Sequence, residues 1–481
     1  MLRRLLDSPR TYFVAAGLLL VVGVVSQFDV NLPSRPKGGL AELEALKTRD
    51  DVNVVLILID TLRADRLGSY GHDRQTSPVI DSVASTGVRF AEVQSQSSWT
   101  KASMASLWSG LYPRRIGVTR YDHSLAEEAT LPAEILRDAG WRTAGIYRNG
   151  WVEPNFGFSQ GFELYLSPRP SATPLRLERK GPSAAQLQGS DLDATQAARE
   201  FIRSHGHERF FLYVHYMDLH QYIYAEESGL FGTDIRDVYD NAIHWTDRNV
   251  SALFAELENK GILGRTIVVI ASDHGEQFYE HGAEGHAVNL YREVVSTPWI
   301  LVLPFRFDPG VVVETPVQNV DIWPTVLDLL GLSYPGETDG RSVVPLIRAA
   351  VEGTEPPADL VDRRAYAELD RFWGKSDRER VEFVSVVDGP YHLLERFAKD
   401  RHTELYDRRS DPTEQRNVAR ENRELVDDLR GSAQTYLAEE RIWESPDVEL
   451  DAMRLGQLRA LGYVIEDGKP KPNEAKAAPK P

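Results

Sequence analysis

The stretch VNVVLILI, residues 52 to 59, decides the fold, because every residue except Asn53 is apolar and five are β-branched. Such a run is typical of a strand buried on both faces of a sheet. Four similar runs follow: TAGIY (143–147), FFLYVHY (210–216), TIVVIAS (266–272) and PWILVL (298–303). A helical apolar stripe between two of them consists of Ile243, Val250, Leu253, Phe254 and Leu257. Strands that alternate with helices predict an α/β fold with a doubly wound, mostly parallel sheet flanked by helices.

After about residue 350 the pattern changes to short strand-like segments with tight turns. These segments are RAYAEL (364–369), EFVSVV (382–387), PYHLLE (390–395) and TELYD (403–407), followed by a helical pattern near 418–440. We predict a smaller C-terminal subdomain with an antiparallel sheet. The predicted division of the chain is an N-terminal segment 1–28, a linker 29–50, a catalytic domain 51–350, a C-terminal α+β subdomain 351–465 and a polar, Pro-rich, disordered tail 466–481.

The N-terminal segment is a candidate membrane anchor. Eighteen uncharged residues, Thr11 to Phe28, follow three arginines within the first ten positions. At 1.5 Å per residue a helix of this length spans roughly 27 Å, which matches the core of a bilayer. A cleaved signal peptide is the alternative, with Val24 and Ser26 as small residues before the cut. We predict an uncleaved anchor with the catalytic domain on the extracytoplasmic side; after cleavage the protein would be secreted or periplasmic.

Composition excludes several classes of function. The 481 residues contain no cysteine, which removes disulfides, thiolate metal sites and a cysteine nucleophile. Asp and Glu outnumber Lys and Arg by 72 to 55, and the net charge of -17 makes nucleic acid a poor partner. An anionic ester substrate would need a local positive site.

Polar side chains follow several of the predicted strands, where ligands bind in an open α/β sheet. Asp60 follows the first strand, and Asp273 and His274 follow the fourth. Two carboxylates and an imidazole from separate strands predict a divalent-cation site. An Asp after a strand is often only a turn former or a helix cap, and Asp65 and Asp321 fit that role. The other polar residues near strand ends are Arg148, Asn149, Asp218, His220, Glu276, His281 and His286.

Thr100 lies in the segment SSWTKASMASLWSGLYP, residues 97 to 113. A helix that ends at Gly110 would begin near Lys101, which makes Thr100 its N-cap. A cap is compatible with catalysis, because a helix N-terminus stabilises an alkoxide or a phosphate group. The residues leave both roles open.

Six segments together resemble the sulfatase family of the alkaline phosphatase superfamily, over roughly residues 50 to 420. The segments are NVVLILIDTLRADRLGSYG, WTKASMASLWSGLYPRRIGV, ASDHGEQFYEHGAEGH, DIWPTVLDLLGL, DGRSVVPL and ELYDRRSDPTEQRNVA. The resemblance implies that Asp60, Asp273 and His274 are metal ligands. It implies that Thr100 is both a ligand and the nucleophile. The further implied roles are contact with the anionic group for Asn149 and His220, protonation of the leaving group for His286, and a nearby substrate-binding cation for Arg292.

The chain departs from true sulfatases at the nucleophile. Those enzymes have Cys or Ser there, followed by Pro and Arg two and four residues on, and oxidise it to formylglycine. Here the three positions are Thr100, Ala102 and Met104. Oxidation of a threonine gives a ketone, so no formylglycine is expected. His274 replaces the usual Asn, as in relatives that use Thr directly, among them phosphodiesterases and the phosphoglycerol and phosphoethanolamine transferases.

The resemblance therefore predicts a metal-dependent hydrolase or transferase that acts through Thr100, with phosphate esters favoured over sulfate esters. Mn²⁺ or Mg²⁺ is the favoured single ion, and Ca²⁺ or Zn²⁺ is possible. Two alternatives stay open: a sulfuric ester hydrolase of the arylsulfatase type, and an inactive membrane-anchored binding protein. A second ion is conceivable, held by Asp218, His220, His281 or His286. The organic part of the substrate would be set by loops such as 166–192, which carry no motif.

Overall fold

The computed structural model describes residues 35–171, 176–177, 189–375, 378–399, 401–450, 452–460 and 465. The chain divides after Ser34, and everything described belongs to the unit that starts at Arg35. The predicted anchor, residues 1–28, and the tail from residue 466 lie outside the described residues and stay predictions. Among the helices that the structure describes, none is long and apolar enough to cross a bilayer.

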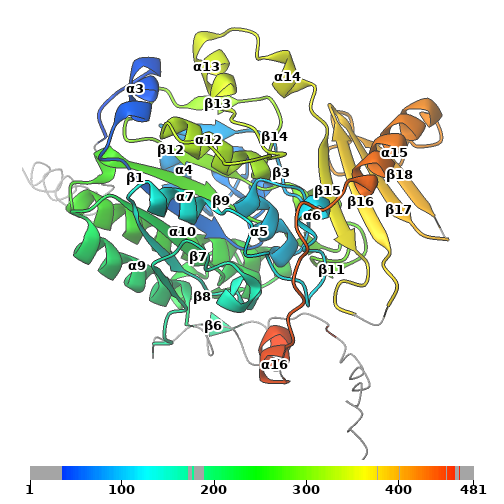
Figure 1. Cartoon of the computed structure of the whole chain (residues 1–481), viewed down its shortest axis with the longest axis horizontal. Coiled ribbons are helices and arrows are strands. Elements are labelled where there is room, and N and C mark those ends of the chain that lie inside the picture. Colours follow the sequence, from blue (N-terminus) through cyan, green and yellow to red (C-terminus); the bar gives the residue numbers. More distant parts are fainter. Residues whose placement is uncertain are drawn as a thin grey trace, which may run out of the picture. The chain divides into compact units, whose positions relative to one another are not determined.

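An eight-stranded sheet forms the centre of this unit, with the order β13-β2-β12-β9-β1-β7-β4-β5 (Figure 1). Its strands are β1 (Asn53–Ile59), β2 (Val88–Phe90), β4 (Arg142–Ile146), β5 (Leu164–Leu166), β7 (Phe210–Tyr216), β9 (Thr266–Ala271), β12 (Trp299–Val302) and β13 (Val311–Val313). Strand β12 runs antiparallel to both neighbours, and the other neighbouring pairs of this sheet are parallel. The predicted mostly parallel sheet is confirmed. Strands β2, β5 and β13 were not predicted, because three residues are too few to show a pattern.

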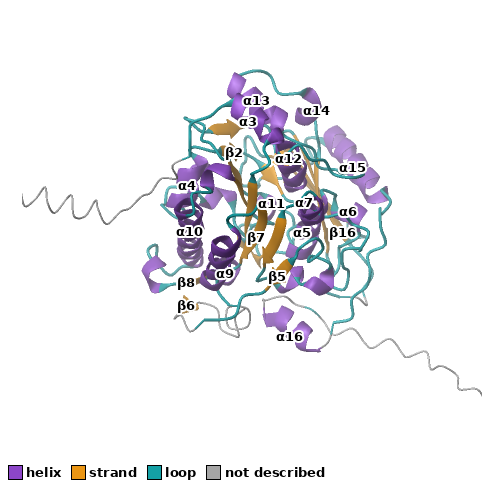
Figure 2. Cartoon of the chain, turned by 60° about the vertical axis from the view of Figure 1, so that its left-hand side comes forward, coloured by secondary structure: helices purple, strands orange, loops and turns teal. Residues whose placement is uncertain are grey.

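Helices cover both faces of the sheet, as Figure 2 shows. One face packs against α5 (Thr100–Ser109), α7 (Pro132–Asp138), α12 (Ile322–Leu329) and α13 (Val344–Glu352), and the other against α4 (Pro78–Ala84), α9 (Asp191–His205) and α10 (Ile235–Asn259). Alternate side chains of β1 belong to the two cores: Leu56 lies in the first and Ile57 in the second, both fully buried. Each such side chain contributes about 1.5–3 kcal/mol of burial free energy. This two-sided burial explains why the strand is continuously apolar.

The predicted C-terminal sheet is also present. It is fully antiparallel and consists of β15 (Ala365–Asp370), β16 (Glu382–Asp388), β17 (Tyr391–Phe397) and β18 (His402–Asp407). Helix α15 (Arg423–Ala438) packs on it through Val426, Leu429 and Ala433 (Figure 1). The remaining elements are α3 (Leu40–Ala45), α6 (Pro113–Ile116), α11 (Arg292–Val295), α14 (Ala358–Val361), α16 (Ala452–Ala460), β3 (Val93–Gln94), β6 (Arg176–Leu177), β8 (Ile223–Tyr224), β10 (Gln277–Phe278), β11 (Glu284–Gly285) and β14 (Val317–Gln318), besides short 3₁₀ turns.

The segment predicted as a linker, residues 29–50, is part of the folded unit where the structure describes it. From Arg35 onward it packs on the sheet domain: the Arg35 guanidinium donates to the carbonyl oxygens of Leu303 at 2.7 Å and Phe305 at 2.9 Å. Leu43 and Leu46 are buried in the first core. Two leucines three residues apart give this polar-looking segment an apolar side. Residues 29–34 lie outside the described part of the chain.

Candidate active site

Three predicted metal ligands converge at the carboxyl ends of two neighbouring strands. Asp60 follows β1, Asp273 and His274 follow β9, and these strands pair in parallel. One ligand atom from each of the three lies within 4.8 Å of the others, and all three residues are completely buried. The parallel register therefore brings together residues that lie far apart in the sequence.

Each carboxylate has one oxygen anchored and one without a hydrogen-bond partner among the described residues. Asp60 Oδ2 accepts from Asn149 Nδ2 at 2.6 Å, whereas Asp60 Oδ1 has no partner. Asp273 Oδ1 accepts from the Thr61 amide at 3.3 Å, whereas Asp273 Oδ2 has none. Buried polar atoms without partners are costly and rare. Two such oxygens beside one imidazole fit a divalent cation.

The third ligand is also prepared for a metal. His274 Nδ1 lies 3.0 Å from the Gly275 carbonyl oxygen, which can only accept, so Nδ1 carries the hydrogen. The lone pair of the neutral ring is then on Nε2, which lies 3.4 Å from Asp273 Oδ2. A backbone carbonyl that fixes the tautomer in this way is the usual support of a ligating histidine.

Electrostatics at the site differ for the two acids. Burial disfavours the charge of Asp60, but the hydrogen bond from His215 and the charges of nearby histidines outweigh it and hold the pKa of Asp60 below its ordinary value. Burial and the charge of Asp60 raise the pKa of Asp273. Ionisation of Asp273 is therefore opposed by the negative charge of Asp60. A bound cation would offset this repulsion.

A strained turn sets the position of Asp60. Thr61 has φ of 61°, an unusual value for a β-branched residue, and its amide points to Asp273. The Tyr239 hydroxyl donates to the Thr61 carbonyl at 2.6 Å, and Ser272 Oγ accepts from the Leu62 amide at 2.9 Å. These contacts stabilise the strained backbone conformation of Thr61.

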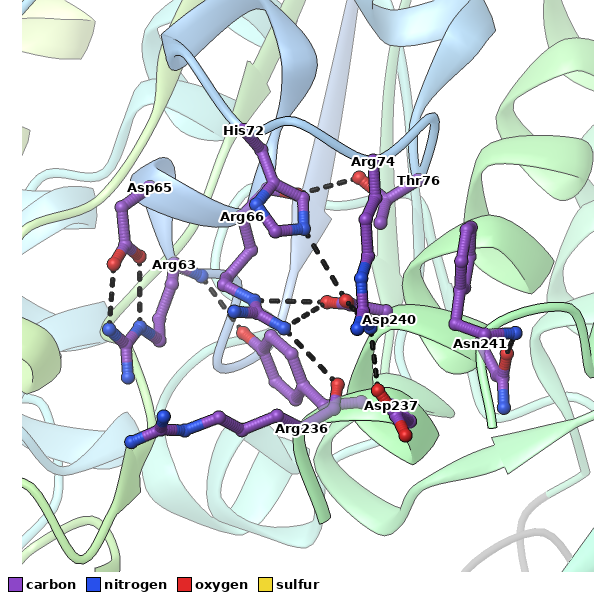
Figure 3. Close-up of polar contacts among 12 residues, drawn as sticks. Arg63, Asp65, Arg66, His72, Arg74, Thr76, Arg236, Asp237, Asp240 and Asn241 are labelled. Carbon is purple, nitrogen blue, oxygen red and sulfur yellow. Dashed lines mark hydrogen bonds and ion pairs between the residues drawn. The ribbon is translucent and has the colours of Figure 1, made fainter. Parts of the chain in front are cut away.

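The loop after this turn is fixed to α10 by ion pairs, which Figure 3 shows. Asp240 is completely buried and accepts from Arg66 at 2.6 Å and from Arg74 at 2.9 Å. Asp65 pairs with Arg63 at 2.7 Å, which agrees with a structural role for Asp65. Asp240 therefore fixes the loop that follows the Asp60 turn to α10.

Thr100 is the first residue of α5, and the residue at the N-cap is Trp99. The prediction that Thr100 caps the helix is wrong by one position, because the first helical hydrogen bond runs from the Ser103 amide to the Trp99 carbonyl. No side chain caps this helix. Thr100 Oγ1 lies 3.1 Å from His274 Nε2 and 3.4 Å from Asn149 Nδ2. The hydroxyl therefore belongs to the candidate site and not to a cap.

Two further histidines complete the cluster. The ring of His286 lies 4.5 Å from that of His274 and 4.8 Å from that of His220, measured between centroids. His286 Nδ1 contacts Glu276 Oε1 at 3.2 Å. Burial lowers the pKa of His286, but the charge and the hydrogen bond of Glu276 outweigh it, so this pKa lies above its ordinary value. The structure thus brings together the predicted residues Asp60, Thr100, Asn149, His220, Asp273, His274 and His286.

None of the described contacts of Arg292 is with a residue of this cluster. Its amide donates to Glu414 Oε2 at 2.8 Å and its guanidinium to the Pro412 carbonyl at 3.0 Å. Arg292 lies at the start of the four-residue helix α11 and is directed to the segment after β18. The substrate contact that the resemblance implies for Arg292 stays a prediction, because the described contacts of Arg292 are with the segment after β18.

Two candidate ligands of a second ion are already occupied. Asp218 pairs with Arg148 at 2.6 Å and accepts from Trp245 Nε1 at 2.7 Å. Burial, against the opposing charge of Arg148, raises the pKa of Asp218 to about 7. His281 contacts Glu293 Oε1 at 2.7 Å and the Glu414 carbonyl at 2.8 Å, one with each ring nitrogen. Neither residue has a ligand atom to offer.

His215 was missed by the sequence analysis, because it lies inside the apolar run of β7 and looks like a core residue. Its Nε2 lies 3.1 Å from Asp60 Oδ2, and its Nδ1 lies 2.8 Å from the Tyr213 hydroxyl. A carboxylate only accepts, so Nε2 carries the hydrogen, and Nδ1 lies within hydrogen-bond distance of the Tyr213 hydroxyl. His215 thereby turns the other oxygen of Asp60 toward the candidate metal position.

We expect His215→Gln to weaken metal binding by about 10–100-fold, because it removes an outer partner of a ligating carboxylate. Isothermal titration of the metal-free protein with Mn²⁺ measures this change. His207→Gln is the control, since His207 is exposed and contacts only Glu208 in the described part of the chain. Equal affinities for His215→Gln and the wild type would contradict the assigned role.

The site and fold can now be compared with known proteins. A family model described as Sulfatase matches residues 52–332, and one described as N-sulphoglucosamine sulphohydrolase, C-terminal, matches residues 280–439. Steryl-sulfatase of Mus musculus is 23% identical over an alignment of 527 positions, and this alignment covers 82% of this chain and 83% of that protein. A solved 2-O GAG sulfatase has a TM-score of 0.65 at 19% identity, covering 81% of this chain and 92% of the other. Phosphonate monoester hydrolase of Agrobacterium radiobacter has a TM-score of 0.62 at 20% identity, covering 80% and 95%.

Together, the fold, the site and these similarities define an ester hydrolase. The chain belongs to the sulfatase family, within the alkaline phosphatase superfamily, because the family model spans more than half of its length. The resemblance stated from the sequence is confirmed.

Proposed function

We propose that this enzyme is metal-dependent, uses Thr100 as its nucleophile and prefers phosphate esters to sulfate esters. The observation that carries the proposal is the 3.1 Å contact of Thr100 Oγ1 with His274 Nε2, beside two carboxylate oxygens without partners. A hydroxyl at this place contacts one of the three candidate ligands directly. The chain has no cysteine, so the nucleophile acts as an alcohol and not as an oxidised aldehyde.

The residues divide the reaction between them. A divalent cation held by Asp60, Asp273 and His274 would supply positive charge for the ester and the attacking hydroxyl. Thr100 enters this step as an alkoxide, after its proton has passed to solvent, and its Oγ attacks phosphorus in line while the bond from phosphorus to the alcohol oxygen breaks. His286, whose charged form Glu276 stabilises, donates its proton to that leaving oxygen.

The second half of the reaction restores the enzyme. Water, or an acceptor alcohol in a transferase, gives its proton to His286 and attacks the phosphothreonine. The bond from phosphorus to Thr100 breaks, and Thr100 is released as the alkoxide with which the cycle began. Asn149 and His220 lie where they can orient the anionic group, since Asn149 contacts both Asp60 and Thr100 and His220 contacts His286.

Sulfate ester hydrolysis is the second candidate. The family model and the relative named steryl-sulfatase favour it. The same side chains could transfer a sulfuryl group, but the sulfated threonine would then need direct attack by water. An oxidised nucleophile has an easier route, because its hydrate can expel sulfate as the carbonyl forms again. Because Thr100 acts as an alcohol, we expect phosphate esters to be better substrates than sulfate esters.

One assay decides between these candidates. The full chain, supplied with Mn²⁺, is tested against phosphate monoesters, phosphate diesters and sulfate esters of the same chromogenic phenol. We expect kcat/KM to be at least about tenfold higher for one phosphate class than for the sulfate ester, a difference of about 1.4 kcal/mol. A higher value for the sulfate ester would overturn the preference. Metal binding without turnover of any ester would identify an inactive binding protein.

A further inference from the structure

We infer that Trp373 and Glu414, both outside the main sheet domain, are positioning residues that hold His286 in place for proton transfer. The inference rests on the proposed function, since it concerns the proton that His286 gives to the leaving group. His286 comes directly after β11, the second strand of the β10–β11 hairpin. Its contacts within the sheet domain include Glu276 and two histidine rings.

Trp373 lies in the turn after β15 and contacts the residue next to His286. Its Nε1 donates to the Ala287 carbonyl at 3.1 Å. The Ala287 amide donates to the Ser98 carbonyl at 2.8 Å, and Ala287 has φ of 58°, which is unusual for a residue with a side chain. The backbone after His286 is thus held between the C-terminal subdomain and the segment that leads to Thr100.

The same indole also contacts the start of the nucleophile helix. Trp373 stacks on Trp99 with ring centroids 4.5 Å apart and an interplanar angle of 23°. Trp99 is the N-cap of α5, directly before Thr100. Trp373 is 7% exposed, so both contacts are shielded from water. One side chain therefore fixes the distance between the nucleophile and the backbone that carries His286.

Glu414 holds the hairpin on its other side. Its carbonyl accepts from His281 Nε2 at 2.8 Å, at the tip of the hairpin, and its Oε2 accepts from the Arg292 amide at 2.8 Å. His281 stacks on Tyr291 at 3.7 Å between centroids, and Tyr291 donates to Glu404 in β18 at 2.7 Å. The C-terminal subdomain therefore contacts the chain before His286, at His281, and after it, at Tyr291 and Arg292.

A buried hydrogen-bond chain keeps Glu414 in place. Its Oε1 contacts His392 Nδ1 at 2.5 Å, and His392 Nε2 contacts Ser385 Oγ at 2.6 Å. Hydroxyl, imidazole and carboxylate in this order resemble a nucleophilic triad. All three residues are at most 1% exposed, so no substrate can reach the hydroxyl. Glu414 itself has φ of 54°, and the chain to β16 and β17 stabilises this strained backbone.

Displacement of His286 should have a specific kinetic signature. An acid that protonates the leaving oxygen matters greatly for a poor leaving group and little for a good one. A small misplacement of a catalytic group can cost on the order of 100-fold in rate. Loss of the Trp373 or Glu414 contact should therefore reduce kcat for esters of weakly acidic alcohols and spare esters of acidic phenols. General destabilisation would reduce both alike.

The experiment compares Trp373→Phe and Glu414→Gln with the wild type on a series of aryl phosphate esters whose phenols differ in acidity. Trp373→Phe keeps an aromatic ring for the stack and removes the N–H. Glu414→Gln replaces one acceptor oxygen by an amide that cannot accept. The matched controls are Trp443→Phe and Glu382→Gln, which have no described contact with residues 277–293. We expect a loss of roughly 10–100-fold in kcat on the poorest leaving group, less than about threefold on the best, and little change in KM.

His286→Ala provides the reference slope of rate against leaving-group acidity. If His286→Ala is steep and the two variants keep the wild-type slope, the positioning inference fails and the proposed acid stands. If His286→Ala keeps the wild-type slope, the assignment of the acid fails and the inference fails with it. Melting curves show whether Glu414→Gln is folded. Should it be unfolded, Trp373→Phe alone decides, and an equal loss on every ester overturns the inference.

Discussion

Thr100→Ala should remain folded and lose turnover by about 10⁴-fold or more, the scale on which enzymes lose activity with their nucleophile. The reason is geometric: Thr100 Oγ1 is the alcohol oxygen that contacts His274, and α5 carries it to the carboxyl ends of β1 and β9. The free energy of unfolding should change by less than the roughly 1 kcal/mol typical of a lost cap, because Trp99 and not Thr100 is the N-cap residue of α5. Steady-state rates and melting curves measure both effects.

Thr100→Ser is the matched control, since it retains the hydroxyl and should keep measurable activity. Intact-mass analysis of wild-type enzyme quenched during turnover should show one phosphoryl group on the peptide that contains Thr100. The alanine variant should show none. Near wild-type turnover by Thr100→Ala would refute the nucleophile and leave Thr100 as a mere neighbour of the metal site.

Asp273→Ala should abolish tight binding of the divalent ion. The variant removes one of the two buried oxygens without a partner and leaves the ion with a single carboxylate. Metal content per chain, measured by elemental analysis after dialysis, should fall sharply, and activity should fall with it. An ion that binds only the folded state raises its melting temperature, so this rise on addition of Mn²⁺ should vanish in the variant.

In the absence of metal the same variant should be no less stable than the wild type, because Asp60 then loses a neighbouring negative charge. Asp65→Ala is the control: it removes an acid near Asp60 whose side chain is 63% exposed and pairs with Arg63. Its metal content should match that of the wild type. Full metal occupancy in Asp273→Ala would remove Asp273 from the ligand set.

The sequence predicted those parts of the fold and site that depend on local patterns. Apolar runs marked β1, β7 and β9, and the mostly parallel sheet followed from the α/β alternation. Asp60 and Asp273 could be found because they stand directly at strand ends. These are properties of neighbouring residues in the chain.

The missed features depend on tertiary contacts. His215 looks like a core residue, and its role exists only because β7 pairs with β1 beside Asp60. The family resemblance assigned Arg292 to the substrate, and the sequence did not indicate that Glu414, more than a hundred residues away, accepts from its amide. The three-residue strands owe their conformation to pairing with β12, β4 and each other, which no propensity of their own indicates.

The central place of β1 has a consequence for the synthesis of this protein. The strand is made early, yet both of its partners in the sheet come much later; 212 residues separate Thr61 from Asp273, which follows the second partner. At translation rates of about 5–20 residues per second this interval lasts roughly 10–40 s. During that time the seven residues of β1, six of them apolar, have no neighbour on at least one edge and are open to pairing with another chain. The strand that organises the finished enzyme is therefore also the segment of the nascent chain most in need of protection from aggregation.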